Sequence, residues 1–176
     1  MRRTFVYAIA VVAVAIGAAT AAAANAHFKH GSPVFTDNGL SLTASGGLTG
    51  LGNGDVVITV TVDNAQPVSS CTNPAGKTQP PGQNPARASL TGVQALPGSD
   101  IKNGNLNFNV NTGTPVTPIA GAPDCPGSNW TENISDVIFF GLTNPPATAT
   151  ITVYQPCTDT TLPIDCPIVL QQSFTL

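Results

Sequence analysis

The two histidines of the chain, His27 and His30, are the side chains best suited to bind a metal ion. Cleavage after Ala26 would make His27 the first residue. Its α-amine and imidazole would then chelate Cu(II), which favours tetragonal nitrogen and oxygen ligands. A site of this kind needs a second histidine from a distant strand, whereas His30 follows in the same segment. Copper binding by His27 and His30 is therefore an alternative function, and a solvent-exposed terminus is the simpler interpretation.

The four cysteines, Cys71, Cys125, Cys157 and Cys166, allow three disulfide pairings. Cys157 and Cys166 flank a turn-rich stretch between two expected strands, so a bridge between them would close a hairpin. Cys71 and Cys125 then pair by elimination. Loop closure would contribute about 2.7 kcal/mol for the short bridge and about 4 kcal/mol for the long one, as upper values. We predict both bridges; the alternative is four free buried thiols.

Motifs for nucleophilic or metal-dependent hydrolysis are absent, since the chain has neither G-x-S-x-G nor H-E-x-x-H. Counting alone leaves open an Asp/Glu pair for glycoside hydrolysis. However, Glu132 is the sole glutamate, and a carbohydrate cleft normally offers more aromatic side chains than Trp130 and Tyr154. The acids are scattered without a D-x-D-x-D-G calcium loop. We therefore expect no catalytic residues.

The first 26 residues have the features of a secretory signal peptide. Arg2 and Arg3 form a short positive region, residues 5–24 carry no charge, and Ala24-Asn25-Ala26 is an A-x-A cleavage site. An uncleaved anchor is the alternative, because a membrane span takes roughly 20 residues. The alanine-rich end of the segment favours cleavage. Arg2-Arg3 also fits a loose twin-arginine pattern, whereas the very short positive region and the very apolar core favour ordinary Sec export. We predict a signal peptide over residues 1–26 and a single domain over residues 27–176, secreted or at the cell surface, with no membrane association after cleavage.

The composition of the mature chain limits its partners. Removing 26 of 176 residues leaves 150, with nine acidic and four basic side chains and hence a net charge of −5. An acidic chain does not bind nucleic acid through a basic face. Charged residues are only 9% of the sequence, so solubility must come from Thr, Ser, Asn and Gln. Such a surface suits an extracellular protein and also suits close packing of subunits.

Short β-rich runs alternate with Gly- and Pro-rich turns along the mature chain, and we find no convincing helix. Residues 56–62 are β-branched at every position and form the clearest strand. Residues 40–44 alternate with period 2, and Gly46-Gly47 is expected to break the stretch that follows them. Further strands are expected at 34–36, 88–96, 106–110, 134–140, 148–154 and 168–176, with a loop over residues 72–87. The pattern predicts an all-β, immunoglobulin-like Greek-key β-sandwich of about eight or nine strands after a cleaved signal helix.

Several short motifs together resemble a family of small exported bacterial β-sandwich proteins of unknown function. In that family a GLGN turn precedes an alternating strand, followed by C-x-N-P-G-G and by C-x-P before an S/T-D-V strand. The matching residues here are Ala26-His27-Phe28, Gly50-Leu51-Gly52-Asn53, Cys71-Thr72-Asn73-Pro74-Ala75-Gly76, Cys125-Pro126 and Ser135-Asp136-Val137. The chain departs from the pattern at Ala75 and in the added Cys157–Cys166 segment. The resemblance implies export, a β-sandwich and pairing of the first two cysteines, and it implies no activity.

Taken together, these features predict an exported, non-enzymatic β-sandwich that acts as a structural or adhesive subunit of a cell surface, matrix or filament. Its expected partners are further copies of itself or other cell-surface components, and neither nucleic acid nor a cofactor is expected. Residues 27–45 could pair with the sheet edge of another molecule, in which case shortening residues 27–36 would reduce assembly and leave the fold intact. The alternative is a module that binds a small ligand or copper through His27.

Overall fold

The computed structural model describes residues 25–79, 87–117, 119, 125–141, 144–158 and 166–176. The predicted signal peptide lies almost entirely outside these residues. Apart from one 3₁₀ turn, η1 (Gly98–Asp100), the regular structure of the described residues is all β, as the sequence predicts. The strands are β1 (His27–Phe28), β2 (Val34–Asp37), β3 (Leu42–Thr49), β4 (Asp55–Thr72), β5 (Thr78–Gln79), β6 (Ala88–Leu96), β7 (Leu106–Asn111), β8 (Thr131–Ile138), β9 (Thr148–Cys157) and β10 (Ile168–Thr175).

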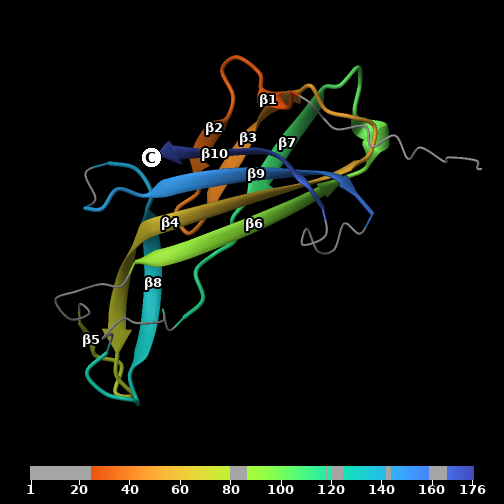
Figure 1. Cartoon of the computed structure of the whole chain (residues 1–176). Helices are drawn as coiled ribbons and strands as arrows, with labels where there is room; N and C mark the ends of the chain where they lie inside the picture. Colours follow the sequence, from red (N-terminus) through yellow and green to blue (C-terminus); the bar gives the residue numbers. More distant parts are fainter. Residues whose placement is uncertain (1–24, 80–86, 118, 120–124, 142–143, 159–165) are drawn as a thin grey trace, which may run out of the picture.

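The strands form two antiparallel sheets (Figure 1). In the first sheet β3 is central, with β1 and β2 paired to successive parts of one edge and β7 paired to the other edge. In the second sheet the order is β10-β9-β4-β6 along the first part of β4. The second part of β4 pairs instead with β8 and β5. The sheets face each other across one apolar core, which is the arrangement of a β-sandwich.

Strand β4 shows why the sheets pack in this way. Its side chains alternate, and Val56, Ile58, Val60 and Val62 are completely buried against the other sheet. Complete burial of one such side chain stabilises the fold by about 1.5–3 kcal/mol. The opposing layer of the core comes from β3 and β7, and β9 extends the layer that β4 begins. The core residues from these strands include Leu42, Leu48, Leu106, Phe108, Val110, Ile151 and Val153.

The expected break at Gly46-Gly47 does not occur, because β3 continues through both glycines to Thr49. The glycines are needed for packing. A Cβ at Gly46 would lie 2.8 Å from the Ser32 side chain, and one at Gly47 would lie 2.6 Å from the Lys29 side chain. The connection between β1 and β2 therefore passes directly over this part of β3.

The two sheets contact each other at both sides of the sandwich. On one side a Cβ at Gly92 of β6 would clash with the backbone oxygen of Asn111, so β6 and β7 approach each other at the limit of backbone contact. On the other side Phe174 of β10 packs its ring against Phe28 and Phe35, with centroid separations of 5.8 Å and 5.5 Å. Edge-on aromatic contacts of this kind add to the free energy gained by burial.

The turn before β4 is held by Gln155, a buried side chain of β9 that is 2% exposed. Its amide oxygen accepts a hydrogen bond from the Gly52 N–H at 2.9 Å, and its amide nitrogen donates to the carbonyl oxygens of Gly52 and Gly54 at 3.0 Å and 2.8 Å. All the polar groups involved are thereby satisfied. The Gly-rich turn singled out in the sequence thus has a structural partner far along the chain.

Residues 66–72 of β4, together with β8 and β5, form an extension that we call the arm (Figure 1). It begins where the β4 register shifts between Val62 and Ala65, at Asn64, which has a φ of 61°. Beyond this point β4 exchanges its partners β6 and β9 for β8. Strand β4 therefore runs well past the predicted residues 56–62, and β5 lies inside the predicted loop.

The N-terminal strands pair within their own chain. His27 and Phe28 lie opposite Thr49 and Leu48 of β3, and β2 lies opposite residues 42–45. Phe28 and Phe35 also pack against the core. In this structure the segment predicted to pair with another molecule is a component of the first sheet.

Candidate functional site

The two histidines lie near one another in sequence and on the surface of the protein. His27 is exposed at the start of β1, and its Nδ1 lies 2.7 Å from the Asn25 carbonyl oxygen. His30 is exposed in the turn that follows. Within the described residues, no cluster of three or more His, Cys, Asp or Glu side chains is arranged to hold a metal ion. A copper site would depend on the His27 amine and the two imidazoles alone.

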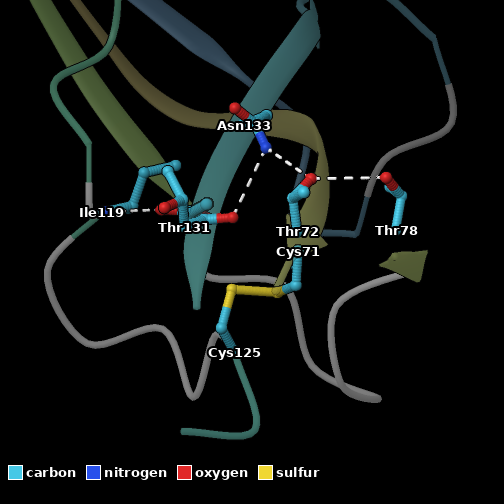
Figure 2. The surroundings of a disulfide bond; sticks show 8 residues. Cys71, Thr72, Thr78, Ile119, Cys125, Thr131 and Asn133 are labelled. Atoms are coloured by element: carbon cyan, nitrogen blue, oxygen red, sulfur yellow. Dashed lines mark hydrogen bonds between the residues drawn. A yellow bond between two sulfur atoms is a disulfide. The ribbon is translucent and has the colours of Figure 1, made fainter. Parts of the chain in front are cut away.

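The structure joins Cys71 to Cys125 and Cys157 to Cys166, the pairing that their spacing predicts. The first bridge ties the end of β4 to the segment before β8 (Figure 2), and its Cα atoms are 5.5 Å apart. Around it Asn133 donates to the Thr72 hydroxyl at 3.0 Å, and the Thr72 and Thr78 hydroxyls are 3.3 Å apart. The bridge therefore fixes the tip of the arm.

Glu132 lies in the same region, and its side chain holds a backbone segment in place. Its carboxylate accepts a hydrogen bond from the Ile119 N–H at 3.1 Å. Other acids have similar tasks: Asp37 accepts from the Gly39 N–H at 2.8 Å, and Asp55 accepts from the Gly98 N–H at 2.7 Å. These carboxylates hold turns and loops in place, which explains their scattered positions in the sequence.

The second bridge covers one end of the outer surface of the second sheet. Val57 points away from the main core, yet it is completely buried in a small cluster with Cys157, Cys166 and Tyr154. The bridge thus provides the apolar contact that this side chain needs. It also marks where the open part of that outer surface begins.

The open part is an array of hydroxyl-bearing side chains that we call the hydroxyl face. On β4 and β9 every second residue points outward, because the residues between them are buried in the core. The strand registers align these outward positions into rows across β10, β9, β4 and β6. The face consists of the hydroxyl side chains Thr59, Thr61, Ser89, Thr91, Thr148, Thr150, Ser173 and Thr175, together with Asp63, Val93 and Gln171. Thr152 lies on the same side of the sheet but is only 5% exposed.

Hydrogen bonds within the rows order these side chains. The Thr150 and Ser173 hydroxyls are 2.9 Å apart, and the Thr61 and Thr91 hydroxyls are 3.4 Å apart. Gln171 donates to Thr152 at 3.1 Å. In the two pairs of hydroxyls, one oxygen keeps a lone pair for an external donor. Because the threonine methyl groups lie beside the hydroxyls, the face can make both polar and apolar contacts.

The outer surface of the first sheet is also polar and has few charges; we call it the amide face. It carries Asn107, Asn109 and Asn111 of β7 beside Thr43 and Ser45 of β3. The charged residue of the hydroxyl face is Asp63. On the amide face, the side chain of Lys29 lies next to Gly47. The other charged residues of the described chain lie in turns, at strand ends or on the arm.

A groove of about 650 Å³ lies between the start of β6 and the segment after β7. Arg87 is its charged lining residue, and this guanidinium donates to Gln66 Oε1 and to the Asn144 carbonyl oxygen, each at 2.9 Å. Among the described residues that line the groove, none is a histidine, an acid or a cysteine. The one charged side chain among the described lining residues, Arg87, is already hydrogen-bonded within the protein. These residues therefore include no pair of titratable groups for acid–base or nucleophilic chemistry.

Comparisons with known proteins add no relative: no protein-family model matches the chain, and neither a curated protein nor a solved structure shows significant similarity to it. In the described part of the chain, no helix has the length and hydropathy needed to cross a membrane. The composition predicts a polar surface rich in Thr and Asn, but not the hydroxyl face itself. The signal for it was the T-x-T pattern at residues 59–61 and 148–152.

Proposed function

We propose that the protein is an exported, non-enzymatic β-sandwich that acts as a structural or adhesive subunit at the cell surface or in the extracellular matrix. The observation that carries this proposal is the hydroxyl face, a broad ordered surface with a single charged side chain. A surface of this kind recognises by shape and by repeated weak polar contacts. It is complementary to an uncharged partner, because a charged group would lose its hydration there without gaining a counter-ion.

The distribution of titratable groups supports a role without turnover. Glu132, Asp37 and Asp55 already accept hydrogen bonds from the backbone. The cysteines are bridged, and the histidines are exposed at the N-terminal strand. Catalysis needs a titratable group within reach of a reacting partner, and these residues are either engaged or far from the groove at Arg87.

The strand order supports an immunoglobulin-like Greek-key topology, which forms part of the proposal. The pairing of β3 with β7 and of β4 with β9 and β10 resembles the B–E and C–F–G pairings of that fold. In this assignment β6 is an additional strand beside β4, and β8 is part of an insertion that builds the arm. Folds of this class carry many unrelated functions, so the functional proposal depends on the surface and not on the topology.

Export is supported by the chemistry of the cysteines. Two disulfides persist in an oxidising compartment and are rare in the cytosol. We also propose that residues 1–26 are a signal peptide, in agreement with the resemblance to small exported bacterial proteins. Removal of residues 1–26 would leave β1 as the first strand of the first sheet.

Fractionation of cells that produce the full chain tests this proposal. The protein is expected in the cell-surface or matrix fraction, with a mass that matches residues 27–176 and no free thiol. Recovery of the protein from the cytoplasm with reduced cysteines would contradict the proposal. So would hydrolytic or oxidative turnover by the purified protein that is lost in the variant Glu132→Gln or His27→Ala.

The alternative function, copper binding, has one observation in its favour. His27 Nδ1 lies 2.7 Å from the Asn25 carbonyl oxygen, and Asn25 precedes the proposed cleavage site. Cleavage would therefore free both the α-amine and the Nδ1 atom of the same residue. These two nitrogens form a chelate that Cu(II) accepts.

A further inference from the structure

Strand β10 is an edge strand of the second sheet. Within the described residues its one partner is β9. The Leu176 N–H donates to the Ala147 carbonyl oxygen, so alternation along the strand turns the backbone groups of Thr175, Ser173 and Gln171 away from β9. A row of N–H and C=O groups of this kind is a template for another strand.

Two of the other edges, β2 and β8, carry features that discourage pairing. Strand β2 has four residues, follows Pro33 and ends at Asp37. Strand β8 carries Glu132 and Asp136, and its pairing with β4 has a register shift. Strand β6 is packed at Gly92 against the backbone of Asn111, and its Gln94 side chain accepts a hydrogen bond from the Asn109 N–H, so β7 covers it from the core-facing side. Short length, charge, proline, irregular register and covering segments are the means by which proteins protect sheet edges.

Among the residues that the structure describes, none of these protections acts on most of β10. The strand has eight residues, with the sequence Ile-Val-Leu-Gln-Gln-Ser-Phe-Thr, and contains neither a charge nor a proline. Its one register shift lies at the start, between Ile168 and Leu170. From Leu170 onward its pairing with β9 is regular, so the free edge is straight enough to accept a strand.

We propose that β10 pairs in antiparallel fashion with β10 of a second copy, around a two-fold axis at Ser173. In this register Ser173 faces its own counterpart, Gln171 faces Thr175, and Leu170 faces Leu176 of the other copy. The outward-turned backbone groups of Gln171, Ser173 and Thr175 satisfy one another. This inference rests on the proposed function and names its partner, since it makes the structural subunit a dimer.

The charge distribution of the protein leaves this edge open to a second copy. The mature chain has a net charge of −5, so two copies repel each other wherever their acidic residues meet. Neither β10 nor the neighbouring strand β9 carries a charged residue, so two copies that meet at β10 bring no like charges together within these strands. Pairing there joins the two hydroxyl faces into one continuous surface and leaves no free edge on β10. The two-fold axis closes the assembly as a pair instead of extending it into a filament.

The test is the molar mass of the secreted protein, measured by light scattering after size exclusion over a range of concentrations. The wild-type protein is expected at twice the mass of one chain. Ser173→Lys places two like charges opposite each other across the axis, so we expect the dimer dissociation constant to rise at least about tenfold. Thr91→Lys is the matched control, because Thr91 is an exposed hydroxyl of the same face that also pairs with a cross-strand hydroxyl. It should remain dimeric.

Mixing two variants of opposite charge distinguishes the loss of the interface from damage to the fold. Ser173→Lys and Ser173→Asp should each be monomeric, and their mixture should form a heterodimer because the opposed charges then attract. A monomeric wild-type protein at every concentration would overturn the proposal. Equal loss of the dimer in Thr91→Lys, or failure of the mixture to pair, would also overturn it. These outcomes leave the cell-surface role untouched, because that role is tested by fractionation.

Discussion

The Ser173 hydroxyl of β10 lies 2.9 Å from the Thr150 hydroxyl of β9, on the outer side of the second sheet. This contact ties the edge strand to its neighbour through side chains as well as backbone. It also continues the row that Thr61 and Thr91 form on β4 and β6. The hydroxyl face and the free edge of β10 therefore share a residue. A charge at Ser173 affects both the edge and the face, whereas a charge at Thr91 lies on the face beside the groove and away from the edge.

Replacing Gln155 by leucine should lower the free energy of unfolding by about 2–4 kcal/mol. The change leaves polar groups of Gly52 and Gly54 without their partner in a buried site. Urea denaturation followed by fluorescence or circular dichroism measures the effect. Gln79→Leu on β5 is the matched control, because Gln79 is exposed and the same chemical change there should stay within about 0.5 kcal/mol. Equal effects of the two variants would contradict the role assigned to Gln155.

Gly92→Ala should destabilise the fold by about 1–3 kcal/mol, since the added methyl group meets the backbone of Asn111 and the two sheets must separate. Gly47→Ala is the comparison, because its methyl group meets the Lys29 side chain, which can move. Thermal unfolding midpoints of the two variants provide the test. A larger loss in Gly47→Ala would show that the β6–β7 contact is not the tighter one.

Removal of the Cys71–Cys125 bridge by paired alanine substitutions should cost up to about 4 kcal/mol, and removal of the Cys157–Cys166 bridge up to about 2.7 kcal/mol. Cys71 lies outside the main core cluster, so the first change should open the arm and leave the sandwich folded. Hydrogen exchange is the measurement, with faster exchange expected in β8 and unchanged protection in β3 and β7. Loss of protection throughout the chain would show that the arm is required for the sandwich to fold.

Deletion of residues 27–36 should now reduce stability in addition to any effect on assembly. Phe28 and Phe35 pack against Phe174, and β1 and β2 pair with β3. Phe28→Ala alone should cost about 2–3 kcal/mol, less than a fully buried phenylalanine because the ring is half-buried. Denaturant titration of this variant measures the cost. An unchanged unfolding midpoint would restore the interpretation of the segment as a donor strand.

Cu(II) provides the test of the alternative function. Because the described residues bring no third ligand to His27 and His30, the copper-induced rise in the unfolding midpoint should be small, and similar in the wild-type protein and in His30→Ala. Calorimetric titration of the secreted protein gives the same comparison directly. Tight binding at one equivalent that requires both histidines would favour the copper-binding function over the structural one.

The parts of the fold that the sequence predicts are those with local signals. Residues 56–62 alternate β-branched side chains, and that pattern alone identifies a strand with one buried face. The arm was missed because β4 continues through Pro67, which cannot donate to a sheet and usually argues against a strand interior. It is accommodated beside the register shift at Val68 and Ser69.

The hydroxyl face is a property of strand registers, which no local pattern specifies. The T-x-T runs show that Thr59, Thr61, Thr148 and Thr150 share an outward side with their neighbours. They do not show that Thr61 lies opposite both Thr150 and Thr91. That alignment depends on pairing between strands far apart in the chain, and it is fixed by the burial of the alternate side chains in the core.

Retention of the secreted protein on the surface of the producing cells tests the central claim most directly. Washed cells that lack the protein are incubated with wild-type, Thr91→Lys or Asn109→Lys protein, and the bound fraction is measured after sedimentation. Thr91 lies on the hydroxyl face and Asn109 on the amide face, and both are exposed. We expect retention of wild-type and Asn109→Lys protein and at least about tenfold weaker retention of Thr91→Lys. No retention of wild-type protein, or equal retention of all three proteins, would contradict it.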